Sequence, residues 1–257
     1  MNFLYYFRYF FFIAKNWNVK LAFFTVFHEI KGEKKYGIHT IKIDRLHHLK
    51  IESENLVHSS IYQGANYFVL EKAFDFLENK NINNSIIDFG CGKGRVMAVA
   101  AFYGFKNITG IDFSPELCAA AEKNVASIKA KFPSTKFSVI CLDAVNFTIE
   151  KNTQVFFFFN PFDEVVMLAV TKNILSSLKE NPRKVYIIYV NPLHKEIFES
   201  AGFQEEYYLK KMEYIELSIL SNKRSSFKVA ERRPFTFSIT KTAGWWFAII
   251  RKYSLYR

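Results

Sequence analysis

Between residues 85 and 203, short apolar runs alternate with segments of helical periodicity. Such alternation is typical of a parallel β-sheet with helices packed on both of its faces. The run at 155–159 is apolar at every position, as expected of a central strand that is buried on both sides. The pattern predicts five strands in this region, at residues 85–89, 107–112, 136–142, 155–159 and 184–190.

Helix signals fall between and around these strands. Ser114 followed by Pro115 predicts a helix start, because serine caps free backbone amides and proline fits the first turn. Helices are predicted at residues 67–79, 95–103, 115–131 and 162–179, with a shorter one from about residue 193. Antiparallel strands are predicted at 207–209, 214–220 and 235–240, and residues 39–45 alternate in a strand-like way.

Three regions of different character follow from this pattern. We expect an aromatic-rich extension or lid at residues 1–60, a central α/β domain at 61–220 and a basic extension at 221–257. Residues 1–27 contain twelve aromatic side chains, yet the longest unbroken apolar run is residues 9–14. A membrane span needs about 20 apolar residues. We therefore predict one or two amphipathic helices packed on the central domain, with shallow membrane association as the alternative.

The charge and the cysteine pattern limit which partners and which cellular compartment we expect. The formal net charge is +11, and residues 205–257 supply 11 basic against 5 acidic side chains. A basic end of this kind suggests an anionic partner such as nucleic acid, lipid or acidic protein, or serves solubility alone. The three cysteines (Cys91, Cys118 and Cys141) and the six histidines do not have the spacing of metal ligands, so we expect no metal site. The cysteines also suggest no disulfide framework, so we expect a reducing, cytoplasmic setting. If the N-terminus lies at a membrane interface, the protein would be peripheral to that membrane.

A glycine-rich loop between the first strand and its helix carries the strongest chemical signal. Gly90, Gly92 and Gly94 allow a tight turn, and the helix that follows presents free N–H groups to a polar ligand. Asp88 lies two positions before the first glycine. A carboxylate there would repel a pyrophosphate but suits a cationic ligand. The loop, Asp88-Phe89-Gly90-Cys91-Gly92-Lys93-Gly94, resembles the first motif of the class I S-adenosylmethionine (SAM)-dependent methyltransferases, (D/E)xGxGxG.

The resemblance covers about residues 62–203 and implies both a fold and a cofactor. The fold is a Rossmann-like three-layer sandwich with a mostly parallel seven-strand sheet and an antiparallel C-terminal strand, here with an N-terminal helical or β extension. The cofactor is SAM. Asp112 ends the second strand, where a carboxylate can accept both ribose hydroxyls. The family's pattern implies cofactor contacts for the residues of the loop and of the strand ends: Asp88, Gly90, Cys91, Gly92, Gly94, Asp112, Phe113, Asp143, Ala144 and Asn160.

Two further segments bear on the methyl acceptor. Asn160-Pro161-Phe162-Asp163, at the end of the fourth strand, resembles the (D/N)PP(Y/F) motif of N-methyltransferases, with Phe162 in place of the second proline. This makes Asn160 the candidate catalytic residue, which would orient an acceptor nitrogen beside the cofactor. The segment from Ile61 to Tyr67 resembles that of the non-SET protein-lysine methyltransferases, in which a tyrosine, here Tyr62, closes over the methionine end of the cofactor.

The leading hypothesis is a SAM-dependent N-methyltransferase acting on a protein lysine or another amine. A second hypothesis is a nucleic-acid methyltransferase, favoured by basic residues interleaved with phenylalanines at 223–237. A small-molecule or lipid-headgroup methyltransferase is equally compatible with an interfacial N-terminus. The third is a non-catalytic protein with a Rossmann-like fold that binds SAM or nothing.

Overall fold

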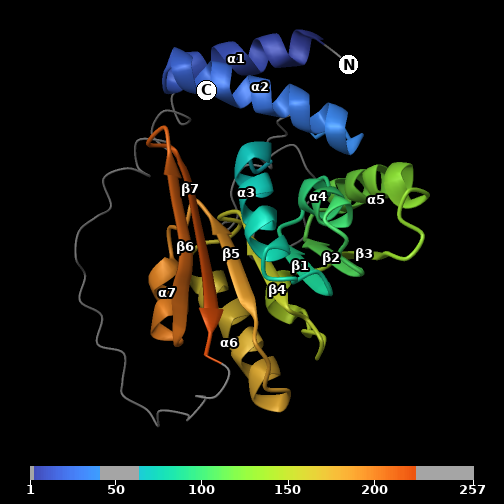
Figure 1. Cartoon of the computed structure of the whole chain (residues 1–257), viewed down its shortest axis with the longest axis vertical. Helices are drawn as coiled ribbons and strands as arrows, with labels where there is room; N and C mark the ends of the chain where they lie inside the picture. Colours follow the sequence, from blue (N-terminus) through green and yellow to red (C-terminus); the bar gives the residue numbers. More distant parts are fainter. Residues whose placement is uncertain (1–2, 41–63, 224–257) are drawn as a thin grey trace. The chain divides into compact units, whose positions relative to one another are not determined.

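The computed structural model describes residues 3–40 and 64–223, all within one compact unit that spans Met1–Ser225. In this part of the chain, seven strands form one sheet in the order β3-β2-β1-β4-β5-β7-β6 (Figure 1). The strands are β1 (Ser85–Phe89), β2 (Asn107–Asp112), β3 (Lys136–Cys141), β4 (Val155–Phe158), β5 (Tyr186–Val190), β6 (Phe203–Lys211) and β7 (Ile215–Asn222). Strands β1 to β5 pair in parallel, and β7 runs antiparallel to both β5 and β6. The predicted mixed sheet is confirmed.

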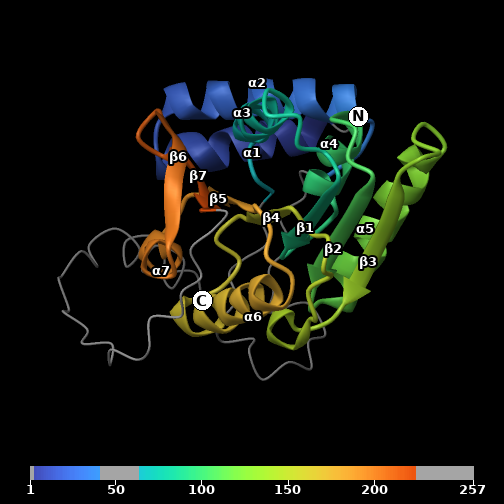
Figure 2. The ribbon, with the colours of Figure 1, turned by 60° about the horizontal axis from the view of Figure 1, so that its bottom comes forward.

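Helices cover both faces of the sheet (Figure 2). One face carries α3 (Tyr67–Glu78), α4 (Arg95–Phe102) and α5 (Pro115–Lys129), and the other carries α6 (Glu164–Glu180) and α7 (Lys195–Ser200). Alternate strand residues enter two separate apolar clusters: Ile86 packs with the α3–α5 side, whereas Ile87 packs with the α6 side. The sheet is therefore the middle of three layers, because successive side chains on a strand point to opposite faces.

Two helices precede the sheet. They are α1 (Phe3–Asn16) and α2 (Val19–Tyr36), which pack on each other as a helical hairpin. Helix α2 contacts α3 and α4, so the predicted packing of N-terminal helices on the central domain is confirmed. Asn18 caps α2 by accepting the amide of Leu21 at 2.7 Å, and Gly37 ends it in the left-handed region, where glycine carries no steric penalty.

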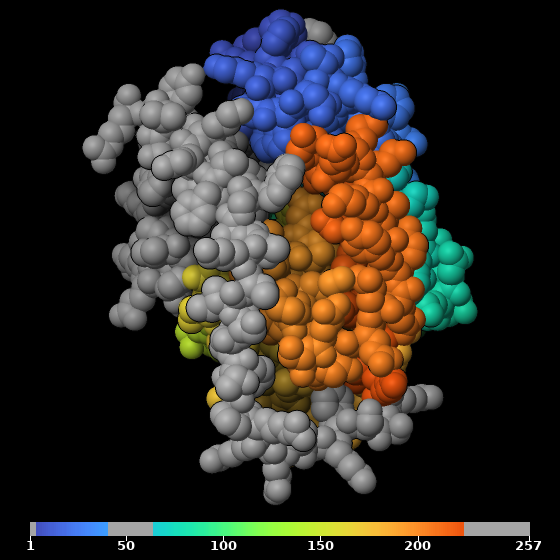
Figure 3. All heavy atoms as spheres, turned by 90° about the vertical axis from the view of Figure 1, so that its left-hand side faces the viewer, coloured from blue at the N-terminus to red at the C-terminus, as the bar shows by residue number. Residues whose placement is uncertain are grey.

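Most predicted element boundaries agree with the structure to within two residues. The Ser114 side chain accepts the Leu117 amide and so begins α5, as predicted. Helix α6 starts at Glu164 because Asp163 caps it from outside, accepting the amides of Val165 and Val166. The predicted C-terminal strands were too short: β6 and β7 extend over nine and eight residues, and β6 is the edge strand of the sheet. Their atoms form part of the orange surface in Figure 3.

Some predictions fall on residues that lie outside the described ranges. These are the strand at 235–240, most of the alternation at 39–45, the Tyr62 segment and nearly all of the basic extension at 221–257. The structure therefore adds nothing to them. Among the residues it does describe, no helix is both long enough and apolar enough to cross a bilayer.

Candidate functional site

The glycine loop follows β1 at the carboxyl edge of the sheet. Gly90, Gly92 and Gly94 have φ angles of 77°, 52° and 76°, a region that residues with a side chain rarely adopt. A Cβ atom on Gly90 would lie 2.7 Å from Cβ of Pro161. Glycine is therefore required at position 90 both by its backbone angle and by its neighbour, and the loop lies directly against the segment that follows β4.

Backbone hydrogen bonds hold the loop to the end of β2. The amides of Gly90 and Cys91 both donate to the carbonyl of Ile111 at 2.9 Å, and the Gly92 amide donates to Oδ2 of Asp112 at 2.9 Å. The Gly94 amide donates to the Cys91 carbonyl at 2.8 Å. Because these four amides already have protein acceptors, we expect the first turn of α4, whose amides lack partners within the helix, to supply the donors for a ligand.

Asp88, two residues before the glycine loop, has a buried side-chain oxygen that lacks a hydrogen bond among the described residues. Its side chain is 2% exposed, and the oxygen in question is Oδ2. Burial raises the pKa of Asp88 well above its usual value, and the nearby carboxyl of Asp112 raises it further. A buried carboxylate oxygen without a donor costs free energy, which a cationic or N–H-bearing ligand would recover. The ammonium group at the methionine end of SAM has this chemistry, so the residues present fit that cofactor.

Asp112 is held in place by the backbone. Its Oδ2 accepts the Gly92 amide, and its Oδ1 accepts the Ser114 amide at 3.0 Å. Burial raises the pKa of Asp112, and these backbone hydrogen bonds oppose that rise. The Phe113 amide also opposes the rise, so three backbone amides act on this carboxylate. An ionised carboxylate has about four acceptor positions in all, which leaves room for a further donor such as a ribose hydroxyl.

The neighbouring strands bring the predicted adenine-side residues to the same edge. Asp112 pairs in register with Cys141, and Asp143 follows two residues later. The Asp143 side chain accepts the Val145 amide at 3.1 Å and so starts a short 3₁₀ helix, η3 (Ala144–Asn146). Phe113 is partly exposed beside them, and its carbonyl accepts the exposed Cys141 thiol. Ala144 is buried at 4% exposure.

Asn160 lies just beyond β4, next to the glycine loop. Its φ angle is 45°, a left-handed conformation that asparagine tolerates better than most residues. Its Oδ1 accepts the Tyr189 hydroxyl at 3.3 Å, and that hydroxyl in turn accepts the His194 amide at 3.4 Å. Tyr189, at the carboxyl end of β5, thus orients the Asn160 amide. We did not predict this tyrosine; its only sequence signal is a hydroxyl-bearing residue near the end of an otherwise apolar strand.

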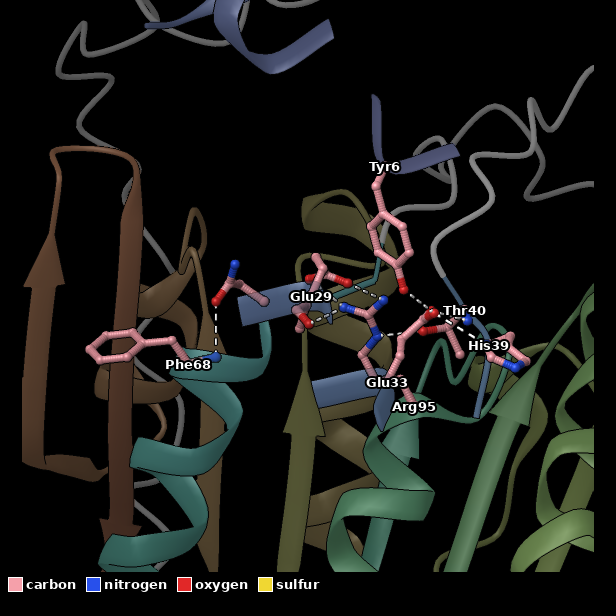
Figure 4. A network of polar contacts seen from close by, with 9 residues as sticks. Tyr6, Glu29, Glu33, His39, Thr40, Phe68 and Arg95 are labelled. Carbon is pink, nitrogen blue, oxygen red and sulfur yellow. Dashed lines mark hydrogen bonds and ion pairs between the residues drawn. The ribbon is translucent and has the colours of Figure 1, made fainter. Parts of the chain in front are cut away.

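The Arg95 network is the second feature that we did not predict (Figure 4). Arg95 is the first residue of α4, directly after Gly94, and is 4% exposed. Its Nη1 and Nη2 lie 2.8 and 2.7 Å from the two carboxylate oxygens of Glu29 on α2. Nε donates to the Thr40 hydroxyl at 2.7 Å, and Nη1 also donates to the Ala65 carbonyl at 2.8 Å. Helix α4, which begins directly after the glycine loop, and α2 of the N-terminal hairpin are therefore joined by a buried ion pair.

Glu33 extends the same network along α2. It accepts the Tyr6 hydroxyl of α1 at 2.7 Å and the Thr40 amide at 2.6 Å, and lies 3.3 Å from Nδ1 of His39 (Figure 4). Nearby, Asn66 caps α3 through the Phe68 amide at 2.9 Å. Residues 64–66 are thus fixed immediately before α3. Tyr62, predicted to close over the cofactor, lies outside the described residues.

The strand order, the glycine loop after β1 and the acidic residues at the ends of β1 and β2 together define a class I, Rossmann-like methyltransferase fold. Residues 86–181 match the model of a family described as a methyltransferase domain. The chain carries a class I SAM-dependent methyltransferase domain, and the protein is a methyltransferase (EC 2.1.1.-) with SAM as its methyl donor.

Comparisons with other proteins do not identify the acceptor. No curated protein sequence matches the chain. A candidate RNA methyltransferase from Pyrococcus horikoshii is similar over 68% of this chain and 90% of its own, with 18% identity and a TM-score of 0.47. A ribosomal protein L11 methylase from Lactobacillus delbrueckii subsp. bulgaricus is similar over 62% of this chain and 81% of its own, with 17% identity and a TM-score of 0.44. Similarity at this level supports no inference about substrate.

Proposed function

We propose that this methyltransferase transfers the methyl group of SAM to an acceptor nitrogen, of a protein lysine or another amine. The observation that carries the proposal is the position of the Asn160 amide. It follows β4, abuts the glycine loop through Pro161 and is oriented by Tyr189. A side-chain amide oxygen held in this way can accept a hydrogen bond from an N–H group and so align the nitrogen lone pair with the donor methyl group.

The carboxyl ends of β1–β3 would hold the cofactor. Asp88 would accept a hydrogen bond from the ammonium group of its methionine end, which supplies the donor that the buried Oδ2 lacks. Asp112 would accept the two ribose hydroxyls. We assign adenine contacts to Phe113, Asp143 and the Ala144 amide, and closure over the methionine end to Tyr62.

The sulfonium of the bound cofactor supplies an already activated methyl group, so the chain has mainly to align the acceptor and exclude water. In transfer, the acceptor nitrogen would gain the methyl group and then release a proton, and SAM would leave as its neutral thioether. An amine attacks only when it is deprotonated, and apolar surroundings favour its neutral form. Phe162, two residues after Asn160 and partly exposed, would contribute to such surroundings.

A methyl-transfer screen with tritiated SAM tests the proposal. Lysine-containing peptides and proteins, small amines, and RNA or DNA are offered separately to the full-length protein. We expect label on peptide or small-amine nitrogen and a loss of about 100-fold in kcat for Asn160→Ala, with SAM affinity retained. Asn191→Ala is the matched control, since Asn191 also has a positive φ of 48° at the end of the adjacent strand but binds the Glu216 amide instead.

Other outcomes assign the enzyme to other acceptors. Label on RNA or DNA alone would favour the basic residues near the C-terminus as a nucleic-acid contact, and would refute the amine assignment. Label on carbon or oxygen of a small molecule would refute the nitrogen assignment. SAM binding with no transfer to any class would favour a non-catalytic role and would contradict the proposal as a whole.

A further inference from the structure

The outward face of the N-terminal hairpin is unusually apolar. Across α1 and α2, six large apolar side chains are each between 52% and 66% exposed: Leu4, Phe7, Phe11, Val19, Phe23 and Phe27. We call these six residues the hairpin patch. The opposite face of α1 is buried through Tyr6, Tyr9 and Ile13. Scattered exposed apolar residues are ordinary in proteins, but a contiguous group marks a surface that binds something.

Helical spacing places the patch on one side of each helix. Residues 4, 7 and 11 of α1 and residues 19, 23 and 27 of α2 are three or four positions apart, so each set lies along one strip. Ring contacts join the two strips. Phe11 lies 4.7 Å from Phe7 and 5.4 Å from Phe10, and Phe10 lies 4.8 Å from Phe23. The patch is therefore one continuous surface.

The charges around the patch have one sign. Residues 3–36 contain only two acidic side chains, Glu29 and Glu33, and both are buried in the network that includes Arg95. All six basic side chains of this segment are exposed: Arg8, Lys15, Lys20, Lys31, Lys34 and Lys35. Lys35 is paired with Glu71 of α3. The exposed surface of these two helices consequently combines aromatic and aliphatic groups with positive charge and carries no negative side chain.

From this combination we infer that the hairpin patch docks onto an anionic lipid surface. Amphipathic helices that lie in a bilayer interface have an apolar strip bordered by lysine and arginine, and each cation near the surface adds electrostatic attraction to anionic headgroups. A second copy of the chain fits less well, because it would set like charges against one another. Single-stranded nucleic acid also fits less well, since Leu4 and Val19 cannot stack on bases and the phenylalanine rings pack edge-to-face on each other.

The inference does not depend on the methyl acceptor. It concerns a surface of α1 and α2, whereas the acceptor site is argued from β4 and β5. It does bear on the structure of the enzyme, because the α2 helix that carries Phe23 and Phe27 also carries Glu29. Glu29 is the partner of Arg95, the first residue after the glycine loop. A lipid surface bound by the hairpin would therefore contact α2, the helix that the Glu29–Arg95 ion pair joins to the start of α4.

Vesicle co-sedimentation of the full-length protein tests the inference. The probes are vesicles of phosphatidylcholine alone and of phosphatidylcholine with 30% phosphatidylglycerol. We expect binding to the anionic vesicles, weakened by salt, and at least about tenfold weaker binding of Phe23→Ser/Phe27→Ser. Val165→Ser/Leu193→Ser is the matched control, because these residues are 63% and 43% exposed but lie far along the chain from the hairpin. Both variants remove exposed side chains, and equal melting temperatures would show that each is folded.

Several results would overturn the inference. One is that the protein does not sediment with anionic vesicles. Another is that Phe23→Ser/Phe27→Ser binds the vesicles as well as the wild type does, which would mean that another surface binds them. A concentration-dependent dimer that the same change abolishes would assign the patch to a second copy of the chain. Binding of RNA, but not of vesicles, that depends on Phe23 and Phe27 would assign it to nucleic acid.

Discussion

Two buried carboxylates near the glycine loop differ in their partners: Asp88 precedes the loop, and Glu29 pairs with Arg95, the residue that follows it. Glu29 is 1% exposed; its Oε1 accepts a hydrogen bond from Arg95, and its Oε2, which makes no hydrogen bond of its own among the described residues, still lies 2.7 Å from Nη2 of Arg95 as an ion pair. Asp88 is 2% exposed and has one oxygen without a partner among the described residues. Burial raises the pKa of both, but Arg95 offsets the rise only at Glu29. The comparison teaches that Glu29 is paired within the protein's own structure, whereas Asp88 retains an oxygen that the proposed cofactor site would use.

The largest expected effect is on stability, at the paired carboxylate. Glu29→Ala leaves the Arg95 charge buried without its counter-ion, so we expect it to lower the free energy of unfolding by about 3–5 kcal/mol. Chemical denaturation measures this. Lys35→Ala is the control, because it breaks an exposed ion pair with Glu71 and should cost less than about 1 kcal/mol. Equal losses for the two variants would mean that burial does not distinguish these pairs.

The next effect is on binding, at the unpaired carboxylate. Asp88→Asn removes the charge that would face the ammonium of SAM, so we expect calorimetry to show affinity lower by about 100-fold, or about 2.7 kcal/mol. The unfolding free energy without ligand should stay equal or rise, since the variant no longer buries an ionised group. Unchanged SAM affinity would remove Asp88 from the site.

A smaller effect is expected on the pH dependence of the unfolding free energy, through the raised pKa of Asp88. The pKa of Asp88 is higher in the folded protein than in the unfolded chain, so the folded state holds the proton more tightly. Its contribution to stability is full below the unfolded pKa of about 3.9 and is lost as pH rises through the folded value, by at most about 1.4 kcal/mol per pH unit. The difference in unfolding free energy between wild type and Asp88→Asn, measured from pH 4 upward, should show this fall. A difference that is constant with pH would contradict it.

The smallest effect concerns the acceptor side. Tyr189→Phe removes the hydroxyl that binds Asn160, and loss of one neutral hydrogen bond should lower kcat about three- to tenfold while SAM affinity is retained. Tyr186→Phe, on the same strand but in the opposite apolar cluster, should leave kcat unchanged. A parallel loss in both variants would indicate damage to β5 rather than to the orientation of Asn160.

Local chemistry explains why much of the fold could be predicted from the sequence. The apolar run of β4, the Ser114 cap and the glycines at 90, 92 and 94 each carry their signal within a few residues. Strand β6 was harder to predict, because an edge strand with charged residues on both faces has no alternating pattern. The candidate cofactor residues were found by their positions at strand ends.

Tertiary contacts account for what was missed. Arg95 was expected only to begin a helix, because nothing near it in sequence reveals a partner 66 residues earlier on another helix. Tyr189 reaches Asn160 across 29 residues, through the pairing of β4 with β5. Periodicity shows which face of an element is apolar, but it does not show against which other element that face packs.

The three thiols described above differ in a way that can be used in practice. Cys91 is buried within the loop and Cys118 is buried on α5, whereas Cys141 is exposed at the end of β3 beside Phe113. Burial raises the pKa of both Cys91 and Cys118, which keeps them as unreactive thiols. A maleimide dye would accordingly label one position, at the rim where the nucleoside is expected to bind, giving the protein a built-in attachment point for a fluorescent sensor.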